Sequence, residues 1–274
     1  MTLELLEKTD APIHLLVRDG DSAAEQRCLS ALRAGDLTSA AVVGQLPARE
    51  ITDVWHCAAS LRFEDRSRYQ LSKIAAEHLV AERDSMSTCI WRPSVVVGHS
   101  RTLSATNFTG RYGLVRECMR FERCAERILG ARFLPKRVGA CVDPTAEINL
   151  VPIDLVVQQA VSLSLRPGFA AGIVHLTNGS APSVGDVVSV VAATAGVREL
   201  EFVTCPSSLT AIERRLDRTM GFYPAQGGGT KSFAQDVAEQ YGAAIHFPMD
   251  VDYLRSLIDW YVDHAGLADK ARAA

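Results

Sequence analysis

The sequence lacks the features of a membrane protein, a metalloprotein and a disulfide-stabilised protein. It contains no run of about 18 apolar residues, so no segment is expected to span a bilayer. Its seven cysteines are scattered, without a CxxC pair or a His/Cys cluster at ligand spacing, so we expect no metal site. Thiols in this pattern predict a reduced, cytoplasmic protein. The N-terminus, residues 1–8, is acidic and amphipathic, unlike a signal peptide.

Neither sign of charge dominates the chain. With 29 Lys and Arg against 32 Asp and Glu, the formal net charge is −3. This balance provides no global attraction to nucleic acid or to a membrane surface. At 274 residues, 47% hydrophobic and 22% charged, the chain has the composition of an ordinary globular protein. We expect one large domain, or a core domain with a smaller lobe.

One segment, residues 111–137, departs from that balance, with eight Arg and Lys against three Glu. Its apolar residues recur at helical spacing, which predicts a helix with a basic outer face. A solvated helix face is the simpler interpretation. The alternative is a docking surface for an acidic carrier protein. Few aromatic residues lie between the charges, which argues against nucleic-acid binding.

Short apolar runs alternate with amphipathic runs along the chain. Strands are predicted at residues 13–17, 52–59, 88–93 and 172–177. Helices are predicted at residues 2–9, 21–34, 68–83, 155–165, 184–195, 207–220 and 250–264. Ser183 followed by Asp186 forms a capping box before the helix at 184–195, and Gly196 ends that helix. This alternation predicts a parallel α/β sheet.

Tyr69 and Lys73 are the clearest candidates for chemistry. They lie four residues apart in the predicted helix at 68–83, which places both positions on one side of that helix. A phenol has an ordinary pKa near 10, and a neighbouring ammonium lowers it by favouring the phenolate. Such a pair can protonate a carbonyl oxygen while a hydride reaches the carbon. The alternative is an ordinary pair on a helix surface.

Several segments, taken in order, resemble the extended short-chain dehydrogenase/reductase family. The closest branch is the thioester-reductase and fatty-acyl reductase group, also called the male sterility type. The matching segments are residues 15–18 with 23–27, residues 35–37, residues 54–59, the Tyr69-x-x-x-Lys73 motif with Glu77, residues 92–98 and residues 149–154.

The resemblance implies a reduced Rossmann-type parallel sheet with a small, mostly helical C-terminal substrate lobe. The core would comprise residues 1–99 with 148–195, and the lobe residues 100–147 with 196–274. The implied activity is NADP-dependent reduction of a carbonyl or thioester, on a small molecule or on an acyl chain bound to a carrier protein. Tyr69 would donate the proton, and Lys73 would lower the pKa of Tyr69 and hold the ribose.

The resemblance also implies a set of cofactor contacts. A cation at Arg18 suits a 2′-phosphate, hence NADP over NAD. A solvated Arg at a strand end is the alternative. Asp36 and Leu37 would contact the adenine, or form a plain turn. Small residues at Ala58 and Ala59 would line the cofactor, or allow close strand packing. Pro93, Ser94 and Val95 would lie near the nicotinamide.

Two parts of the family pattern have no counterpart in this sequence. The Gly-rich turn that holds the pyrophosphate is absent, since residues 2–9 resemble the helix that follows it. The family also has a long helix and a strand with a catalytic Ser or Thr before the tyrosine helix. Here Ala59 and Tyr69 are ten positions apart, too few for both elements.

Three interpretations of these gaps remain open. We expect the sheet to close directly, with the strands on either side of each gap paired to one another. Alternatively, another chain supplies a strand in a homo-oligomer, or the sequence is a shortened form of a longer protein. Two other functions also remain open. The chain could use the dyad without nucleotide for acid–base work, as a cyclase, dehydratase or epimerase, or it could be a non-catalytic binding protein.

Overall fold

The computed structural model describes residues 15–17, 32–34, 66–82, 88–105, 115–116, 118–119, 137–169, 172–197, 199–211, 213–214 and 233–265. The chain divides into two compact units, Met1–Ser87 and Thr88–Ala274. The division into core and substrate lobe stays a prediction. No helix in these described ranges is long and apolar enough to cross a membrane.

In the first unit, β1 (Leu15–Val17) pairs in parallel with β2 (Leu32–Ala34). β1 confirms the predicted strand over its described residues. The predicted helix at 21–34 is wrong at residues 32–34, because pairing with β1 overrides the helix propensity of Leu, Arg and Ala there. The predicted helix at 2–9 and strand at 52–59 lie outside the described residues.

The helix α4 (Arg66–Ala81) confirms the predicted helix that carries Tyr69 and Lys73. Its sequence contains no Gly or Pro and is rich in Ala, Leu, Gln, Lys and Glu, the residues that favour helix. The last turn is closed by a hydrogen bond of 3.0 Å from the Glu82 N–H to the His78 carbonyl. Positions 69 and 73 are therefore one turn apart on a continuous helix.

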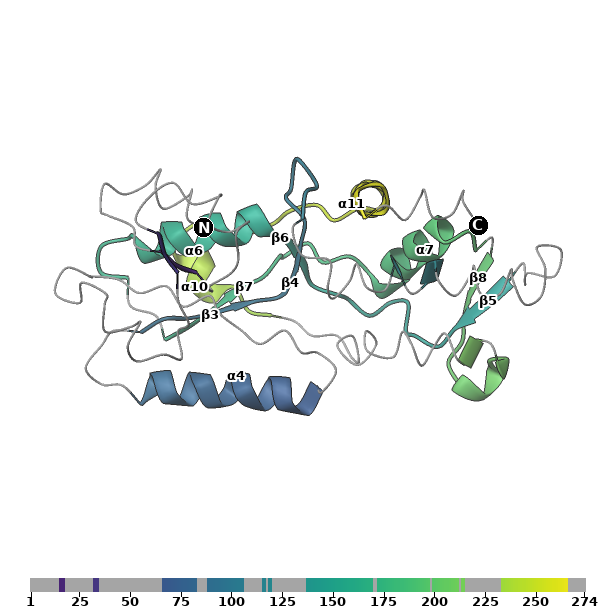
Figure 1. The fold of residues 1–274 in the computed structure, drawn as a ribbon, viewed down its shortest axis with the longest axis horizontal. Coiled ribbons are helices and arrows are strands. Elements are labelled where there is room, and N and C mark those ends of the chain that lie inside the picture. Colours follow the sequence, from purple (N-terminus) through teal and green to yellow (C-terminus); the bar gives the residue numbers. More distant parts are fainter. Residues whose placement is uncertain are drawn as a thin grey trace. The chain divides into compact units, whose positions relative to one another are not determined.

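The second unit is organised around residues 90–97, an extended segment that changes its pairing partner at Ser94 (Figure 1). β3 (Ile90–Pro93) pairs in parallel with β7 (Ile173–Leu176), and β4 (Val95–Val97) pairs in parallel with β6 (Leu150–Pro152). The predicted strands at 88–93 and 172–177 are confirmed.

Two consecutive hydrogen bonds mark the change of partner. The Ser94 N–H donates to the Leu176 carbonyl at the end of β7, at 3.1 Å. The Val95 N–H donates to the Asn149 carbonyl beside β6, at 3.2 Å. Because successive N–H groups of a strand point to opposite edges, β7 and β6 lie on opposite edges of this segment.

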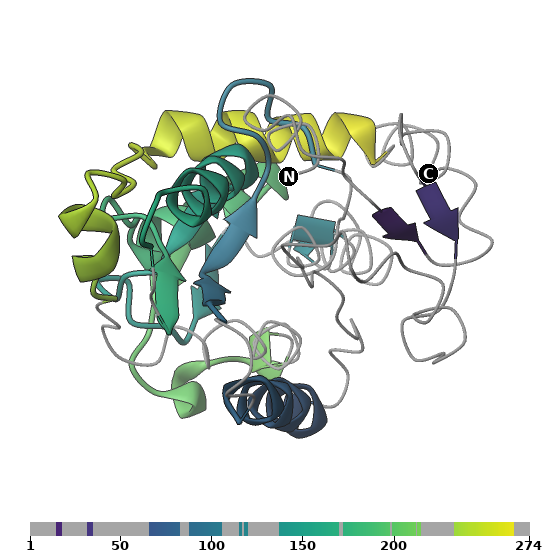
Figure 2. The ribbon, with the colours of Figure 1, turned by 90° about the vertical axis from the view of Figure 1, so that its left-hand side faces the viewer.

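Three helices of the second unit confirm the predicted ones: α6 (Ile153–Ser164), α7 (Val184–Thr194) and α11 (Val251–His264). α7 and α11 pack against each other, with the long α11 running along one side in Figure 2. Their apolar faces meet in one buried cluster that includes Leu150, Val187, Val191, Leu254, Leu257 and Tyr261. α6 begins directly after β6, and the short α10 (Asp236–Gln240) packs near β7.

The ends of α7 follow the predicted capping. The Asp186 N–H donates to the Ser183 hydroxyl oxygen at 3.0 Å, and the Ser183 hydroxyl donates to the Asp186 carboxylate at 2.7 Å. Gly196 follows the helix with φ of 82°, a conformation that glycine adopts without a steric penalty. Both ends of this helix could therefore be predicted from local sequence.

A third parallel pair of the second unit, β5 (Arg137–Ala140) with β8 (Glu199–Phe202), was not predicted. The Gly139 N–H on β5 donates to the Glu213 carboxylate at 2.6 Å, so a side chain satisfies a backbone donor of this strand. Burial opposes ionisation of Glu213, but hydrogen bonds from Gly139 and Thr210 outweigh it and hold its pKa below the ordinary value.

The helix predicted at 207–220 is interrupted. The structure has a 3-10 turn, η2 (Pro206–Ser208), followed by Leu209 in an extended conformation with ψ of 142°. Helical geometry returns at residues 211, 213 and 214, and the remainder of the predicted helix lies outside the described residues, as does the Gly-rich loop at 227–229.

The Asn178 side chain links three segments of the second unit. It is 2% exposed and follows β7. Its Nδ2 donates to the carbonyls of Leu150, Ser180 and Phe247, at 3.1, 3.3 and 2.8 Å. Its Oδ1 accepts from the N–H groups of Ser180 and Phe247, at 3.1 and 2.9 Å. One amide therefore joins β6, the turn after β7 and the segment before α11.

We expect Asn178→Asp to destabilise the protein strongly, because a carboxylate would replace the Nδ2 donor and face three carbonyl oxygens. The expected loss in the free energy of unfolding is about 3 kcal/mol or more, measured by urea denaturation. The matched control is Gln240→Glu, the same amide-to-acid change at an exposed position, with an expected effect below about 0.5 kcal/mol. Equal stability of the two variants would contradict the linking role of Asn178.

Candidate functional site

Ser94, Asn149 and Asn178 form a chain of hydrogen bonds where β3 gives way to β4. The Ser94 hydroxyl donates to Asn149 Oδ1 at 2.6 Å, and the Asn178 N–H donates to the same oxygen at 3.0 Å. Asn149 Nδ2 donates to the Asn178 carbonyl at 2.7 Å. The Ser94 hydroxyl is thus engaged by the protein, and this network holds the point at which the two strand pairs separate.

The three residues predicted near the nicotinamide lie at this point. Pro93 is exposed, whereas Ser94 and Val95 are half-buried. Because the Ser94 hydroxyl and the N–H groups of Ser94 and Val95 all bond within the protein, the exposed Pro93 ring is the group left here for a ligand. Such a ring can offer a flat apolar contact, and the nicotinamide contact stays a prediction.

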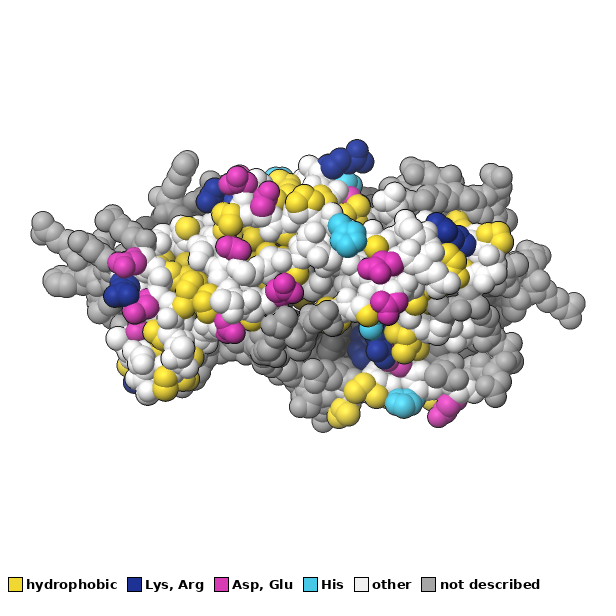
Figure 3. Space-filling model, turned by 180° about the vertical axis from the view of Figure 1, so that it is seen from behind, with side chains coloured by type: hydrophobic (Ala, Val, Ile, Leu, Met, Phe, Trp, Pro, Cys, Tyr) yellow, Lys and Arg dark blue, Asp and Glu magenta, His cyan; other side chains and the backbone are white. Residues whose placement is uncertain are grey.

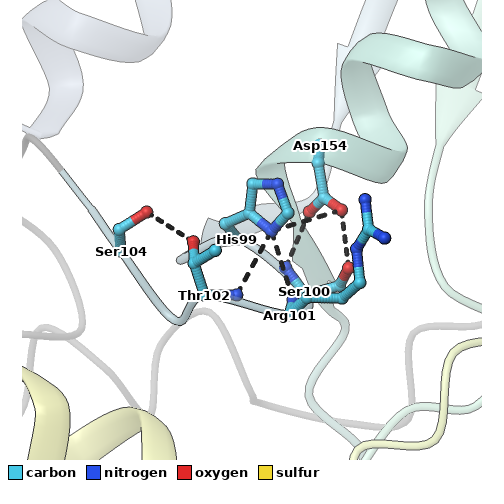
Figure 4. A network of polar contacts seen from close by, with 6 residues as sticks. All are labelled: His99, Ser100, Arg101, Thr102, Ser104 and Asp154. Carbon is cyan, nitrogen blue, oxygen red and sulfur yellow. Dashed lines mark hydrogen bonds and ion pairs between the residues drawn. The ribbon is translucent and has the colours of Figure 1, made fainter.

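A second polar cluster lies at the carboxyl ends of β4 and β6 (Figure 4). Asp154 is the second residue of α6, where a carboxylate is favoured by the positive end of the helix dipole. It accepts the Ser100 N–H at 2.8 Å and the Ser100 hydroxyl at 2.6 Å. These bonds attach the loop after β4 to the start of α6. Ligands of parallel α/β sheets bind at this carboxyl edge.

Serine, histidine and aspartate lie together here, but they do not form a nucleophilic triad. A triad requires the histidine to bond to the serine oxygen as its base. Instead the Ser100 hydroxyl donates to Asp154, and His99 Nδ1 accepts the Arg101 N–H at 3.1 Å. The 3.6 Å separation of His99 Nδ1 and Asp154 Oδ2 is an ion pair only when the imidazole is protonated.

The predicted catalytic pair belongs to the first unit. Tyr69 and Lys73 are both in α4, and Lys73 and Glu77 are half-buried. The remaining cofactor residues predicted from the sequence, namely Arg18, Asp36, Leu37, Ala58 and Ala59, lie outside the described residues. Most of the basic segment at 111–137 also lies outside them.

Other reactive groups do not add a site in the described part of the chain. No cluster of three or more His, Cys, Asp or Glu there could hold a metal ion. Burial raises the pKa of the Cys89 thiol to about 11, which keeps it protonated. Hydrogen bonds from Ser207 lower the pKa of the exposed Cys205 thiol. Cys205 directly precedes η2, and this position brings its sulfur close to Ser207.

Sequence reasoning missed the roles of Asn149, Asn178, His99 and Asp154. The segment 149–154 was recognised as a unit, but nothing in a single sequence shows which polar residue of a loop will be buried. Asn178 follows a predicted strand and precedes Gly179, where an added Cβ would overlap the His246 ring. The local signal for a buried Asn178 is its position, between an apolar strand and a glycine whose backbone lies close to the His246 side chain.

We expect Gly98→Ala to disturb the loop after β4, because an added Cβ would overlap the Leu103 carbonyl oxygen and contact the Leu257 side chain. The expected loss in the free energy of unfolding is about 1–3 kcal/mol, with faster tryptic cleavage after Arg101. Gly172→Ala is the control, since an added Cβ there meets nothing within 4 Å. Unchanged stability and cleavage in Gly98→Ala would show that the loop adapts freely.

Comparisons with known proteins agree with the fold and with the matched motifs. Residues 65–160 match the family model described as male sterility protein, and this segment includes α4, residues 92–98 and residues 149–154. No curated protein matches the chain.

Three solved structures share the fold. The terminal R domain of the myxalamid PKS-NRPS pathway is 20% identical with a TM-score of 0.62, and the match covers 96% of this chain and 87% of that one. A thiolation-reductase di-domain from an archaeal non-ribosomal peptide synthetase is 13% identical with a TM-score of 0.62, covering 97% and 72%. The structure of gox2253 is 18% identical with a TM-score of 0.54, covering 95% and 93%.

The matched segment contains both the Tyr-Lys motif and the two later signatures, and the fold extends the likeness over nearly the whole chain. Residues 65–160 therefore resemble the family described as male sterility protein, and the chain as a whole shares the fold of the myxalamid terminal R domain and of the thiolation-reductase di-domain.

Proposed function

We propose that this protein is an NADP-dependent reductase of carbonyl or thioester groups, including acyl chains held on a carrier protein. The observation that carries the proposal is α4, an unbroken helix that keeps positions 69 and 73 one turn apart within the family match. The likeness to an R domain and to a thiolation-reductase di-domain supports a thioester as the substrate class.

In the proposed mechanism, NADPH would supply a hydride for the carbonyl carbon when bound. The Tyr69 hydroxyl donates a proton to the carbonyl oxygen as charge develops on it. The Lys73 ammonium favours the ionised phenol that remains and holds the ribose. With a thioester, the thiol then leaves and an aldehyde is released.

The remaining cofactor contacts are part of the same proposal. Arg18 would pair with the 2′-phosphate, which gives the preference for NADP. Asp36 and Leu37 would contact the adenine, and Ala58 and Ala59 would leave room for the cofactor. The exposed Pro93, held by the Ser94–Asn149 network, would meet the nicotinamide.

A carrier-bound substrate requires a surface that accepts an acidic carrier. The face shown in Figure 3 carries scattered Asp and Glu side chains among apolar ones and few described Lys or Arg. These described acidic side chains provide no attraction for an acidic partner. The segment at 111–137, with its eight Arg and Lys, has the opposite sign of charge and is the docking surface we propose.

We expect Tyr69→Phe to lower kcat for reduction of octanoyl-N-acetylcysteamine by about 10²- to 10⁴-fold, because it removes the proton donor. NADPH affinity, measured by fluorescence titration, should stay the same. Tyr241→Phe is the matched control, since Tyr241 belongs to an aromatic cluster with Phe169 and Arg166 and has no proposed role in catalysis.

Two outcomes would reject this proposal. Failure of NADPH to bind at millimolar concentration would exclude the redox function altogether. Unchanged turnover in Tyr69→Phe, with NADPH still bound, would exclude a catalytic role for the Tyr69–Lys73 pair but not the binding of the cofactor.

A further inference from the structure

The loop after β4, residues 98–105, is folded on itself. The His99 N–H donates to the Ser104 carbonyl at 3.0 Å, and the Leu103 N–H donates to the His99 carbonyl at 2.9 Å. The hydroxyls of Thr102 and Ser104 are 2.8 Å apart. Leu103 has φ of 61°, a conformation that a leucine adopts only where its surroundings hold it. The loop is therefore a fixed structure in this unit.

Asp154 attaches this fixed loop to α6. Both carboxylate oxygens are used, one by the Ser100 N–H and the other by the Ser100 hydroxyl. Since β4 and β6 are parallel neighbours, the loop after β4 and the first turn of α6 meet at the carboxyl edge of the pair. His99 thus lies at the carboxyl edge of the sheet, and the Ser100–Asp154 hydrogen bonds that hold its loop do not involve the His99 side chain.

The hydrogen bonds of His99 determine which ring nitrogen carries the proton. Nδ1 accepts the Arg101 N–H at 3.1 Å and lies 3.5 Å from the Thr102 nitrogen. A proton on Nδ1 would face these two N–H groups, and Asp154 Oδ2 at 3.6 Å is beyond hydrogen-bond distance. The neutral imidazole therefore carries its proton on Nε2.

The Nε2–H group is directed away from the loop. In Figure 4 the far side of the ring points away from Ser100, Arg101 and Thr102. Within the described ranges, Nε2 has no hydrogen-bond partner, and the side chain is 31% exposed. A donor of fixed direction on a partly exposed side chain, at the carboxyl edge of the sheet, is suited to binding an acceptor.

We propose that His99 donates its Nε2–H to an uncharged acceptor oxygen of the substrate, an amide or hydroxyl oxygen away from the reacting carbonyl. Charge excludes an anionic acceptor, because the Asp154 carboxylate lies 3.6 Å from the ring. Asp154 and Ser100 act as positioning residues for the donor. The identity of the substrate rests on the proposed function, but the donor and its direction do not.

The first test is the protonation of His99 by ¹⁵N NMR of histidine-labelled protein near neutral pH, with His99→Asn used to assign the signal. We expect the proton on Nε2 and Nδ1 unprotonated in the neutral tautomer, and a shift of the Nε2–H signal when octanoyl-N-acetylcysteamine is added. This probe carries an amide oxygen that octanal lacks, so octanal should leave the signal unchanged. A proton on Nδ1, or no shift up to the solubility limit of the probe, would overturn the inference.

The second test uses His99→Asn, whose side-chain oxygen can replace Nδ1 as the acceptor for the Arg101 N–H while the Nε2 donor is lost. We expect KM for octanoyl-N-acetylcysteamine to rise roughly 2- to 10-fold, with kcat and KM for octanal unchanged. His264→Asn, at the exposed end of α11, is the matched control. Equal effects on both substrates, or none on either, would contradict the assignment.

The two proposals fail separately. Absence of NADPH binding rejects the reductase, yet the NMR titration still tests His99 without turnover. NADPH binding and reduction of octanoyl-N-acetylcysteamine with no response of the His99 signal would reject the His99 contact and leave the reductase intact.

Discussion

The exchange of pairing partners at Ser94 determines the arrangement of the second unit. An extended segment can satisfy its N–H groups on two edges, and here one edge is used before Ser94 and the other after it. The junction would expose unpaired backbone groups where β6 and β7 separate. The side chains of Asn149 and Asn178 bind those groups instead, because a primary amide both donates and accepts. Asn178 is buried and Asn149 half-buried, so their amides satisfy these groups largely out of water.

The same junction directs the polar loops to one edge of the sheet. The segment leaves β4 at Gly98 and folds into the loop that carries His99, and β6 leads without a break into α6 and Asp154. Parallel neighbours place these two connections together, so residues 54 positions apart in sequence form a hydrogen-bonded cluster. A rigid sheet with polar loops at its carboxyl edge is the usual arrangement of α/β binding sites.

Prediction from sequence succeeded where a signal was long or locally complete. α4, α6, α7 and α11 have helical periodicity over three turns or more, and the cap at Ser183 depends only on neighbours within one turn. It failed for β2, β4, β5, β6 and β8, which have three or four residues each. Two or three alternations cannot be distinguished from a loop or a helix end, so the pairing partner decides the conformation.

The sequence by itself determined the α/β class, the long helices and the Tyr69–Lys73 spacing, since each follows from residues within a few turns of one another. It also contained the ordered motifs that carry the family resemblance. Only the tertiary structure decided that the Ser94 hydroxyl donates to Asn149, that Asp154 accepts from Ser100 and that His99 Nδ1 accepts the Arg101 N–H. The first two outcomes depend on hydrogen bonds between residues distant in sequence, and such partners are chosen by the packing of the strands and not by local propensity.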